Sequence, residues 1–103
     1  MNPNSCRILT YGKDETLLMT RKAILETARF TCDTAHTAED FVGCINSSPR
    51  GYDIFIVCHS VPPEEQQVIV EAAKGSDVEV YVLKALIQPE DFVAHVQELS
   101  KQC

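Results

Sequence analysis

The chain has 103 residues, of which 45% are hydrophobic and 23% charged, and this balance fits one folded domain over residues 1–103. Its net charge of -6 argues against nucleic acid and against an anionic membrane surface as partners, because both require basic residues. No targeting segment is visible, and the longest apolar run, residues 54–58, is too short to cross a bilayer. We therefore expect a cytoplasmic protein, and the polar ends at Met1 and Cys103 favour a complete small chain.

The first half of the chain alternates short β-prone segments with amphipathic ones. Residues 7–11 (RILTY) predict a strand that Gly12 ends, and Asp14 predicts the N-cap of a helix over residues 15–29. One face of that helix carries its apolar residues, namely Leu17, Leu18, Ile24, Leu25 and Ala28. Residues 30–35 predict a second strand. Thr37, with Asp40 three residues later, resembles a capping box and predicts the start of a helix. This helix ends at residues 46–49 (NSSP), and we expect three of its residues to point inward, namely Phe41, Val42 and Ile45.

The second half repeats the alternation twice. Residues 53–58 (DIFIVC) are apolar from residue 54 onward, which is typical of a strand buried on both faces of a parallel sheet. Residues 62–65 (PPEE) predict the start of a helix that runs to about Lys74 and ends at Gly75. Residues 78–83 predict a fourth strand. Residues 89–91 (PED) begin a last helix with four apolar residues at helical spacing, namely Phe92, Val93, Val96 and Leu99.

Four βα units in succession predict an α/β domain with a doubly wound, flavodoxin-like parallel sheet. We expect the strand order 2-1-3-4 and helices on both faces. Ligands of such sheets bind beyond the carboxyl ends of the strands, where the strand order reverses. In this chain that place is bounded by two segments, Gly12-Lys13-Asp14 after the first strand and Cys58-His59-Ser60 after the third.

Residues 52–62 (YDIFIVCHSVP) resemble the third strand and following loop of response-regulator receiver domains, the CheY-like family. Receivers carry an aspartate near the strand start, a phosphoacceptor aspartate at its end, and a proline four residues later. Asp53 and Pro62 match this pattern, whereas Cys58 stands at the acceptor position. Gly12 and Lys13 stand where the family's acidic pair binds magnesium, and only the following Asp14 is acidic. The resemblance implies a degenerate receiver, shortened by about one of the usual five βα units.

The last strand can be aligned with the family in two ways. If residues 81–86 (YVLKAL) correspond to the fifth receiver strand, Lys84 is the phosphate-contacting lysine. If they correspond to the fourth, Lys84 replaces a threonine or serine. We prefer the second alignment, because loss of an edge unit disturbs a sheet least.

Phosphorylation of a carboxylate needs an oxygen nucleophile and a divalent cation held by oxygen ligands. Neither group is provided by Cys58, Gly12 or Lys13. The charge of Lys13 could replace that of the cation, but the simpler interpretation is that Lys13 is solvated. We therefore expect a pseudo-receiver, a phosphorylation-independent interaction module of signal transduction that is not an enzyme and uses no metal or cofactor. Its partner would be a protein or a second copy, because a missing βα unit exposes an edge.

The five cysteines are irregularly spaced and form no CxxC pair, so we predict reduced thiols, mostly in the core: Cys6, Cys32, Cys44, Cys58 and Cys103. An alternative function is a thiol-based redox sensor or small enzyme that uses Cys58, if His59, Lys13 and Lys84 lower its pKa. We favour a buried Cys58 that ends a core strand. His36 and His95 are expected on the surface, and only proximity would support a metal site at His36, Cys32 and Asp33.

Overall fold

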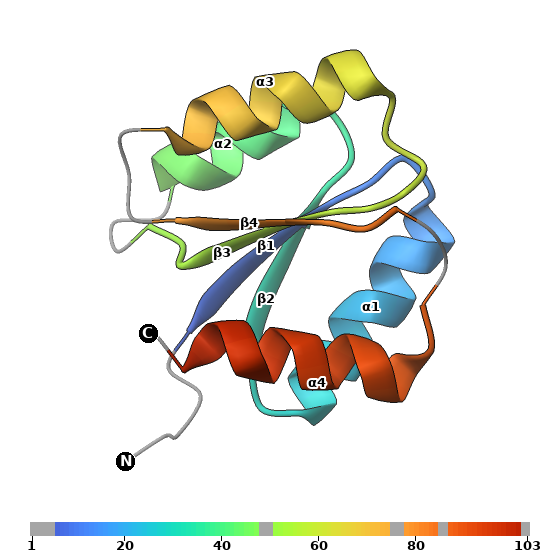
Figure 1. Cartoon of the computed structure of the whole chain (residues 1–103). Helices are drawn as coiled ribbons and strands as arrows, with labels where there is room; N and C mark the ends of the chain where they lie inside the picture. Colours follow the sequence, from blue (N-terminus) through green and yellow to red (C-terminus); the bar gives the residue numbers. More distant parts are fainter. Residues whose placement is uncertain (1–5, 48–50, 75–77, 85–86, 102–103) are drawn as a thin grey trace.

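The structure is a computed structural model that describes residues 6–47, 51–74, 78–84 and 87–101 (Figure 1). Strands and helices alternate as β1 (Arg7–Tyr11), α1 (Glu15–Thr27), β2 (Thr31–Ala35), α2 (Ala38–Ser47), β3 (Ile54–Val57), α3 (Pro63–Ala73), β4 (Glu79–Val82) and α4 (Pro89–Ser100). The strands form one parallel sheet of order β2-β1-β3-β4, which confirms the predicted fold class and strand order. In the described part of the chain, no helix has the length and apolar character needed to cross a membrane.

Helices cover both faces of the sheet, with α1 and α4 on one side and α2 and α3 on the other (Figure 1). Right-handed crossovers explain three of these positions, because β1 to β2 runs in one direction across the sheet and the next two connections run in the other. No described strand follows α4, so no crossover fixes its side. Its buried Phe92 and Val96 pack with Ile8, Leu25 and Ile56 on the face that α1 alone leaves partly uncovered.

The two central strands are buried on both faces, as the uninterrupted apolar run of β3 predicts. All four β3 residues are buried, and their side chains divide between the two cores: Ile54 and Ile56 face α1 and α4, and Phe55 and Val57 face α2 and α3. Parallel pairing of β1 with β3 places Tyr11 beside Val57, so both strands end at the same edge of the sheet. That edge is where the candidate site residues were predicted.

Several predicted details are wrong. Helix α1 ends at Thr27 rather than at residue 29, because Arg29 adopts the left-handed φ of 73° and β2 begins only at Thr31. Val42 was expected to point inward but is 51% exposed, because Phe41 and Ile45, four residues apart, already occupy the buried face of α2. The other predicted bounds agree with the observed ones to within one residue, except that Gly75 and residues 48–49 lie outside the described residues.

The cysteines differ from the prediction in one respect. Cys32, Cys44 and Cys58 are free, and Cys32 and Cys58 are buried as expected. Cys6, however, is disulfide-bonded. Its sulfur lies 3.9 Å from the carbonyl oxygen of Ser100, so the start of β1 meets the end of α4. Sequence spacing could not reveal this bond, because it depends on which distant residues the fold brings together; its partner is not among the described residues.

Candidate functional site

Gly12 and Cys58 are in direct contact at the carboxyl edge of the sheet. The Cys58 N–H donates to the Tyr11 carbonyl at 2.9 Å, which continues the β1–β3 pairing by one residue. A Cβ atom at Gly12 would lie 3.0 Å from the Cys58 sulfur, 3.1 Å from its Cβ and 3.3 Å from Leu18. Any side chain at position 12 would therefore be crowded against Cys58 and Leu18, which would have to shift to accept it.

Cys58 is a buried, free thiol with a side chain only 1% exposed. Burial raises the pKa of the Cys58 thiol, because a thiolate loses hydration there, and nearby Asp14 adds to the rise. The Arg21 guanidinium acts in the opposite direction through its charge and a hydrogen bond, and burial outweighs it. The thiol is therefore held in its neutral form, which is the less nucleophilic one.

Asp14 serves as the N-cap of α1. Its Oδ1 accepts a hydrogen bond from the Leu17 N–H at 3.2 Å, as the sequence predicts for the residue before this helix. The carboxylate thus satisfies a backbone donor that the helix itself leaves unpaired. This role accounts for an aspartate at position 14 without any metal.

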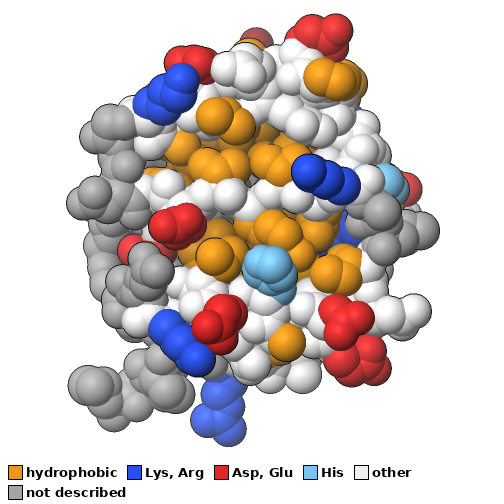
Figure 2. Space-filling model, viewed as in Figure 1, with side chains coloured by type: hydrophobic (Ala, Val, Ile, Leu, Met, Phe, Trp, Pro, Cys, Tyr) orange, Lys and Arg blue, Asp and Glu red, His pale blue; other side chains and the backbone are white. Residues whose placement is uncertain are grey.

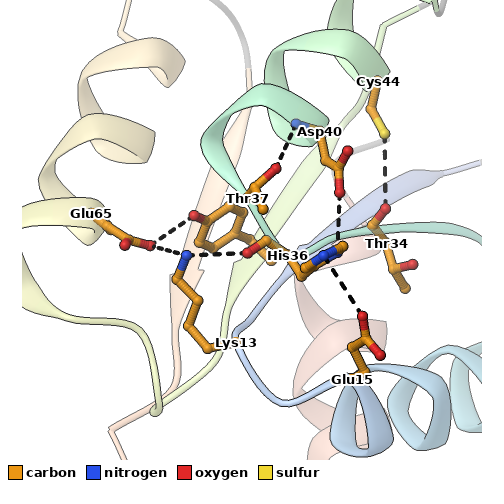
Figure 3. Close-up of polar contacts among 9 residues, drawn as sticks. Lys13, Glu15, Thr34, His36, Thr37, Asp40, Cys44 and Glu65 are labelled. Atoms are coloured by element: carbon orange, nitrogen blue, oxygen red, sulfur yellow. Dashed lines mark hydrogen bonds and ion pairs between the residues drawn. The ribbon is translucent and has the colours of Figure 1, made fainter.

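Lys13 is held by a carboxylate from another element (Figure 3). Its Nζ lies 2.8 Å from Glu65 Oε2, at the start of α3, and donates to the His36 carbonyl at 3.1 Å. The Tyr11 hydroxyl donates to the same Glu65 oxygen at 2.8 Å. The hydrogen bond from Lys13 lowers the pKa of Glu65, and the hydrogen bond to Glu65 raises that of Lys13. Burial and the Glu65 bond raise the pKa of Tyr11.

His36 extends these contacts along the surface after β2 (Figure 3). Its Nδ1 lies 3.0 Å from Asp40 in α2, and its Nε2 lies 3.6 Å from Glu15 in α1. The Thr37 hydroxyl accepts the Asp40 N–H at 3.0 Å, which confirms the predicted capping contact. His36 is exposed, as expected, but it is not isolated.

The predicted site residues do not form one pocket. Gly12 and Cys58 touch, and Asp14 is close enough to influence the Cys58 pKa, whereas Lys13 contacts Glu65 and His36. Lys84 is exposed just after β4 and forms no ion pair within the described part of the chain. Among the described residues, no group of three His, Cys, Asp or Glu side chains is arranged to hold a metal ion.

Arg21 is a site neighbour that sequence reasoning missed. It is 5% exposed in the middle of α1, and its guanidinium carbon lies 5.9 Å from the centre of the Phe92 ring. Its position could have been found from spacing, because residue 21 falls between the buried Leu18 and Leu25 on the same helix face. The identity of the residue, however, argued against a buried position, since arginine is rarely buried. Its cation lies beside Cys58, where a receiver's acceptor would stand.

Two clefts lined by described residues lie away from this edge. One, of about 670 Å³, lies between β2 and α2 and is lined largely by polar and charged residues such as Arg7, Asp33 and Asp40. The other, of about 760 Å³, is an apolar groove between α1 and α4 that includes Ala23, Ile24 and Val93. Neither cleft is lined by Gly12, Lys13, Asp14, Cys58 or Lys84.

Comparison with known proteins supports the fold alone. No protein-family model matches the chain, and no curated protein matches it. Similar solved structures include a CheY-like response regulator receiver domain protein from Methanospirillum hungatei, with 17% identity, a TM-score of 0.64 and 96% of each chain covered. An adenylate cyclase structure from Rhodopirellula baltica has 20% identity and a TM-score of 0.66, covering 95% of this chain and 89% of that one. A de novo designed Rossmann fold protein has 17% identity and a TM-score of 0.62, covering 94% and 98%. The fold is receiver-like, with four βα units.

Proposed function

We propose that this chain is a receiver-like interaction module of signal transduction that acts by binding a protein, without phosphorylation and without catalysis. One observation carries the proposal: the position that matches the receiver phosphoacceptor holds Cys58, a thiol 1% exposed and kept neutral by burial. Aspartyl phosphorylation needs a carboxylate that an incoming phosphoryl donor can reach.

The neighbouring residues support the same proposal. An acidic side chain at position 12 would be crowded against Cys58, and the Asp14 carboxylate caps α1. The Lys13 ammonium is paired with Glu65. With the exception of the exposed Lys84, each residue that would bind magnesium or phosphate in a receiver therefore has a structural role or lacks a ligand atom, which supports a scaffold kept without the chemistry of its switch.

The test is incubation of the folded chain with magnesium and beryllofluoride, which mimics a phosphoryl group on a carboxylate, followed by amide NMR. We expect no magnesium-dependent shifts around Gly12, Asp14 and Cys58, and no added phosphoryl mass after incubation with acetyl phosphate. A phosphorylatable receiver treated in parallel shows that the reagents are active. Shifts at these amides, or a phosphoryl adduct, would contradict the proposal.

A thiol sensor at Cys58 is the competing function, and the same burial opposes it. A thiol with a raised pKa and almost no exposed surface reacts slowly with electrophiles. Alkylation across pH, with each cysteine followed by peptide mass spectrometry, should modify Cys44 first, because Cys44 is only half-buried. A Cys44→Ser variant removes that competing reaction. If Cys58 then reacts as fast as an exposed model thiol, the sensor function is favoured.

A further inference from the structure

Strand β4 lies at the margin of the sheet, and no other described strand pairs with the outer side of its backbone. The N–H groups of Glu79 and Leu83 point to the inner side, where they donate to the carbonyls of Asp53, just before β3, and Val57, at its end, at 3.0 and 2.8 Å. Successive strand residues direct their N–H and C=O groups alternately to the two sides of the strand. The backbone groups of Val80 and Val82 therefore point away from β3, toward the open edge, where an added strand would find them.

The side chains along this edge are apolar. Val78, Val80, Tyr81 and Val82 are each only half-buried, the valines against the core under α2 and α3 and Tyr81 against the core under α4. Figure 2, which shares the view of Figure 1, shows hydrophobic side chains in two bands on either side of the backbone that crosses the middle of the molecule between α3 and α4. The edge is thus flanked by apolar surface from both layers.

The opposite edge of the sheet, β2, carries charged and polar side chains where β4 carries apolar ones. Asp33 in β2 lies 3.9 Å from the Arg7 guanidinium and accepts a hydrogen bond from the Tyr52 hydroxyl, and Thr31 is exposed. Charged and polar residues on an edge strand discourage the addition of another strand. In β4 the charge is confined to Glu79 at its start, so the centre of the strand carries no such protection.

The charges at the two ends of β4 are complementary under a twofold rotation. Glu79 begins the strand and Lys84 follows its end, and within the described residues neither forms an ion pair. When two copies of β4 run antiparallel, the Glu79 end of one strand lies beside the Lys84 end of the other, so opposite charges meet at each end of the joined edges, although the two side chains start from opposite faces of the sheet. Parallel pairing in register would set each charge beside its like.

The pleat of the strand also allows this pairing. Residues that oppose each other in an antiparallel pair lie on the same face of the sheet. Val80 then opposes Val82 of the second copy, with both sets of outward backbone groups hydrogen-bonded, and Tyr81 opposes itself at the twofold axis. This register places valine on valine under one helical layer and tyrosine on tyrosine under the other.

We propose that two copies of the chain associate through β4, antiparallel and centred on Tyr81, to form one continuous sheet. The inference deepens the proposed function by naming the partner and the surface of the interaction module, and it rests on that function. The occupant is a second copy because the edge is complementary to itself in charge, in backbone pattern and in the faces of its side chains.

The first test is the solution mass of the unmodified chain by light scattering over a range of concentrations, with amide exchange measured in parallel. We expect a dimer at high concentration, and slower exchange of the Val80 and Val82 amides there than at low concentration, with no such change in β2. A chain that stays monomeric, or that forms larger open assemblies, overturns the inference.

The second test uses the residue at the axis. Tyr81→Lys and Tyr81→Glu each place like charges opposite each other, so each variant alone should be monomeric while an equal mixture forms a mixed dimer. Met19→Lys, a change on the 61% exposed residue of α1, should dimerise as the unmodified chain does. Circular dichroism checks that each variant is folded. Single variants that still dimerise, or a folded mixture that does not, overturn the twofold pairing.

These outcomes are independent of the beryllofluoride experiment. If the chain is monomeric and does not respond to beryllofluoride, the β4 pairing is wrong, and the proposed phosphorylation-independent module must bind another partner. If the chain is dimeric and responds to beryllofluoride, the proposed function is wrong, and the β4 interface stands.

Discussion

Glu65 is the residue through which three elements meet at the carboxyl edge of the sheet. It lies in the first turn of α3, accepts a hydrogen bond from the Tyr11 hydroxyl at the end of β1, and pairs with Lys13, which in turn donates to the carbonyl of His36 after β2. Its position could be predicted only in part. The sequence PPEE predicts an acidic first turn of a helix, but which cation faces that turn depends on the length of the β1 loop.

Replacing Glu65 with glutamine should lower the free energy of unfolding at neutral pH by about 0.5–1 kcal/mol, a small value because the pair is partly exposed. The folded-state pKa of Glu65 is lowered, so its stabilisation is fully present above the ordinary carboxyl pKa and disappears as the pH falls through the lowered value. Urea unfolding at several pH values should show the two proteins converging in acid. Glu64→Gln, a neighbouring exposed change, should have little effect, and equal losses in both variants would contradict the role of Glu65.

Gly12→Ala should destabilise the chain by about 1–3 kcal/mol, because the new methyl would lie within 3.0 Å of the Cys58 sulfur and overpack the strand ends. The same substitution in a Cys58→Ala background should cost less, since the sulfur is then gone. Urea unfolding of the two single variants and the double variant measures this coupling. Additive losses would show that the contact between positions 12 and 58 does not matter.

At the scale of elements, the alternation of strand and helix could be predicted because each local signal agreed with its neighbours. The apolar run at residues 54–57 predicts a two-sided strand, and proline with acidic residues predicts the starts of α3 and α4. The side of the sheet that α4 covers could not be predicted from handedness. The exposure of Val42 shows that apolar character alone does not assign a helix face when neighbouring residues already fill it.

Asp14→Ala should destabilise the chain by about 1 kcal/mol through loss of the α1 cap, while Asp14→Asn should stay close to the unmodified protein. Asparagine keeps a side-chain oxygen that can accept the Leu17 N–H. Thermal unfolding followed by circular dichroism gives the comparison. If Asn is as damaging as Ala, the negative charge matters more than the cap.

At the scale of the whole molecule, the disulfide of Cys6 ties down the start of β1, where that strand meets the end of α4. We expect a reducing agent to lower the free energy of unfolding by about 2–4 kcal/mol, because the cross-link restricts the unfolded chain. A Cys6→Ser variant should show a similar loss and no further response to the reducing agent. Cys44→Ser should keep that response, and an unmodified chain indifferent to reduction would argue against the disulfide.

The contact between Gly12 and Cys58 bears on how this scaffold could regain a phosphorylation switch. An aspartate at position 58 alone would be larger than the cysteine that already fills the space against Gly12 and Leu18. An acidic residue at position 12 alone would crowd Cys58, because its Cβ would lie 3.0 Å from the cysteine sulfur. Both changes add volume at the same contact, so neither makes room for the other, and a receiver pocket would also require the two strand ends to move apart. Under the proposed function, the packing of the two strand ends would therefore act as an evolutionary ratchet, because no single substitution at position 12 or 58 restores the pocket.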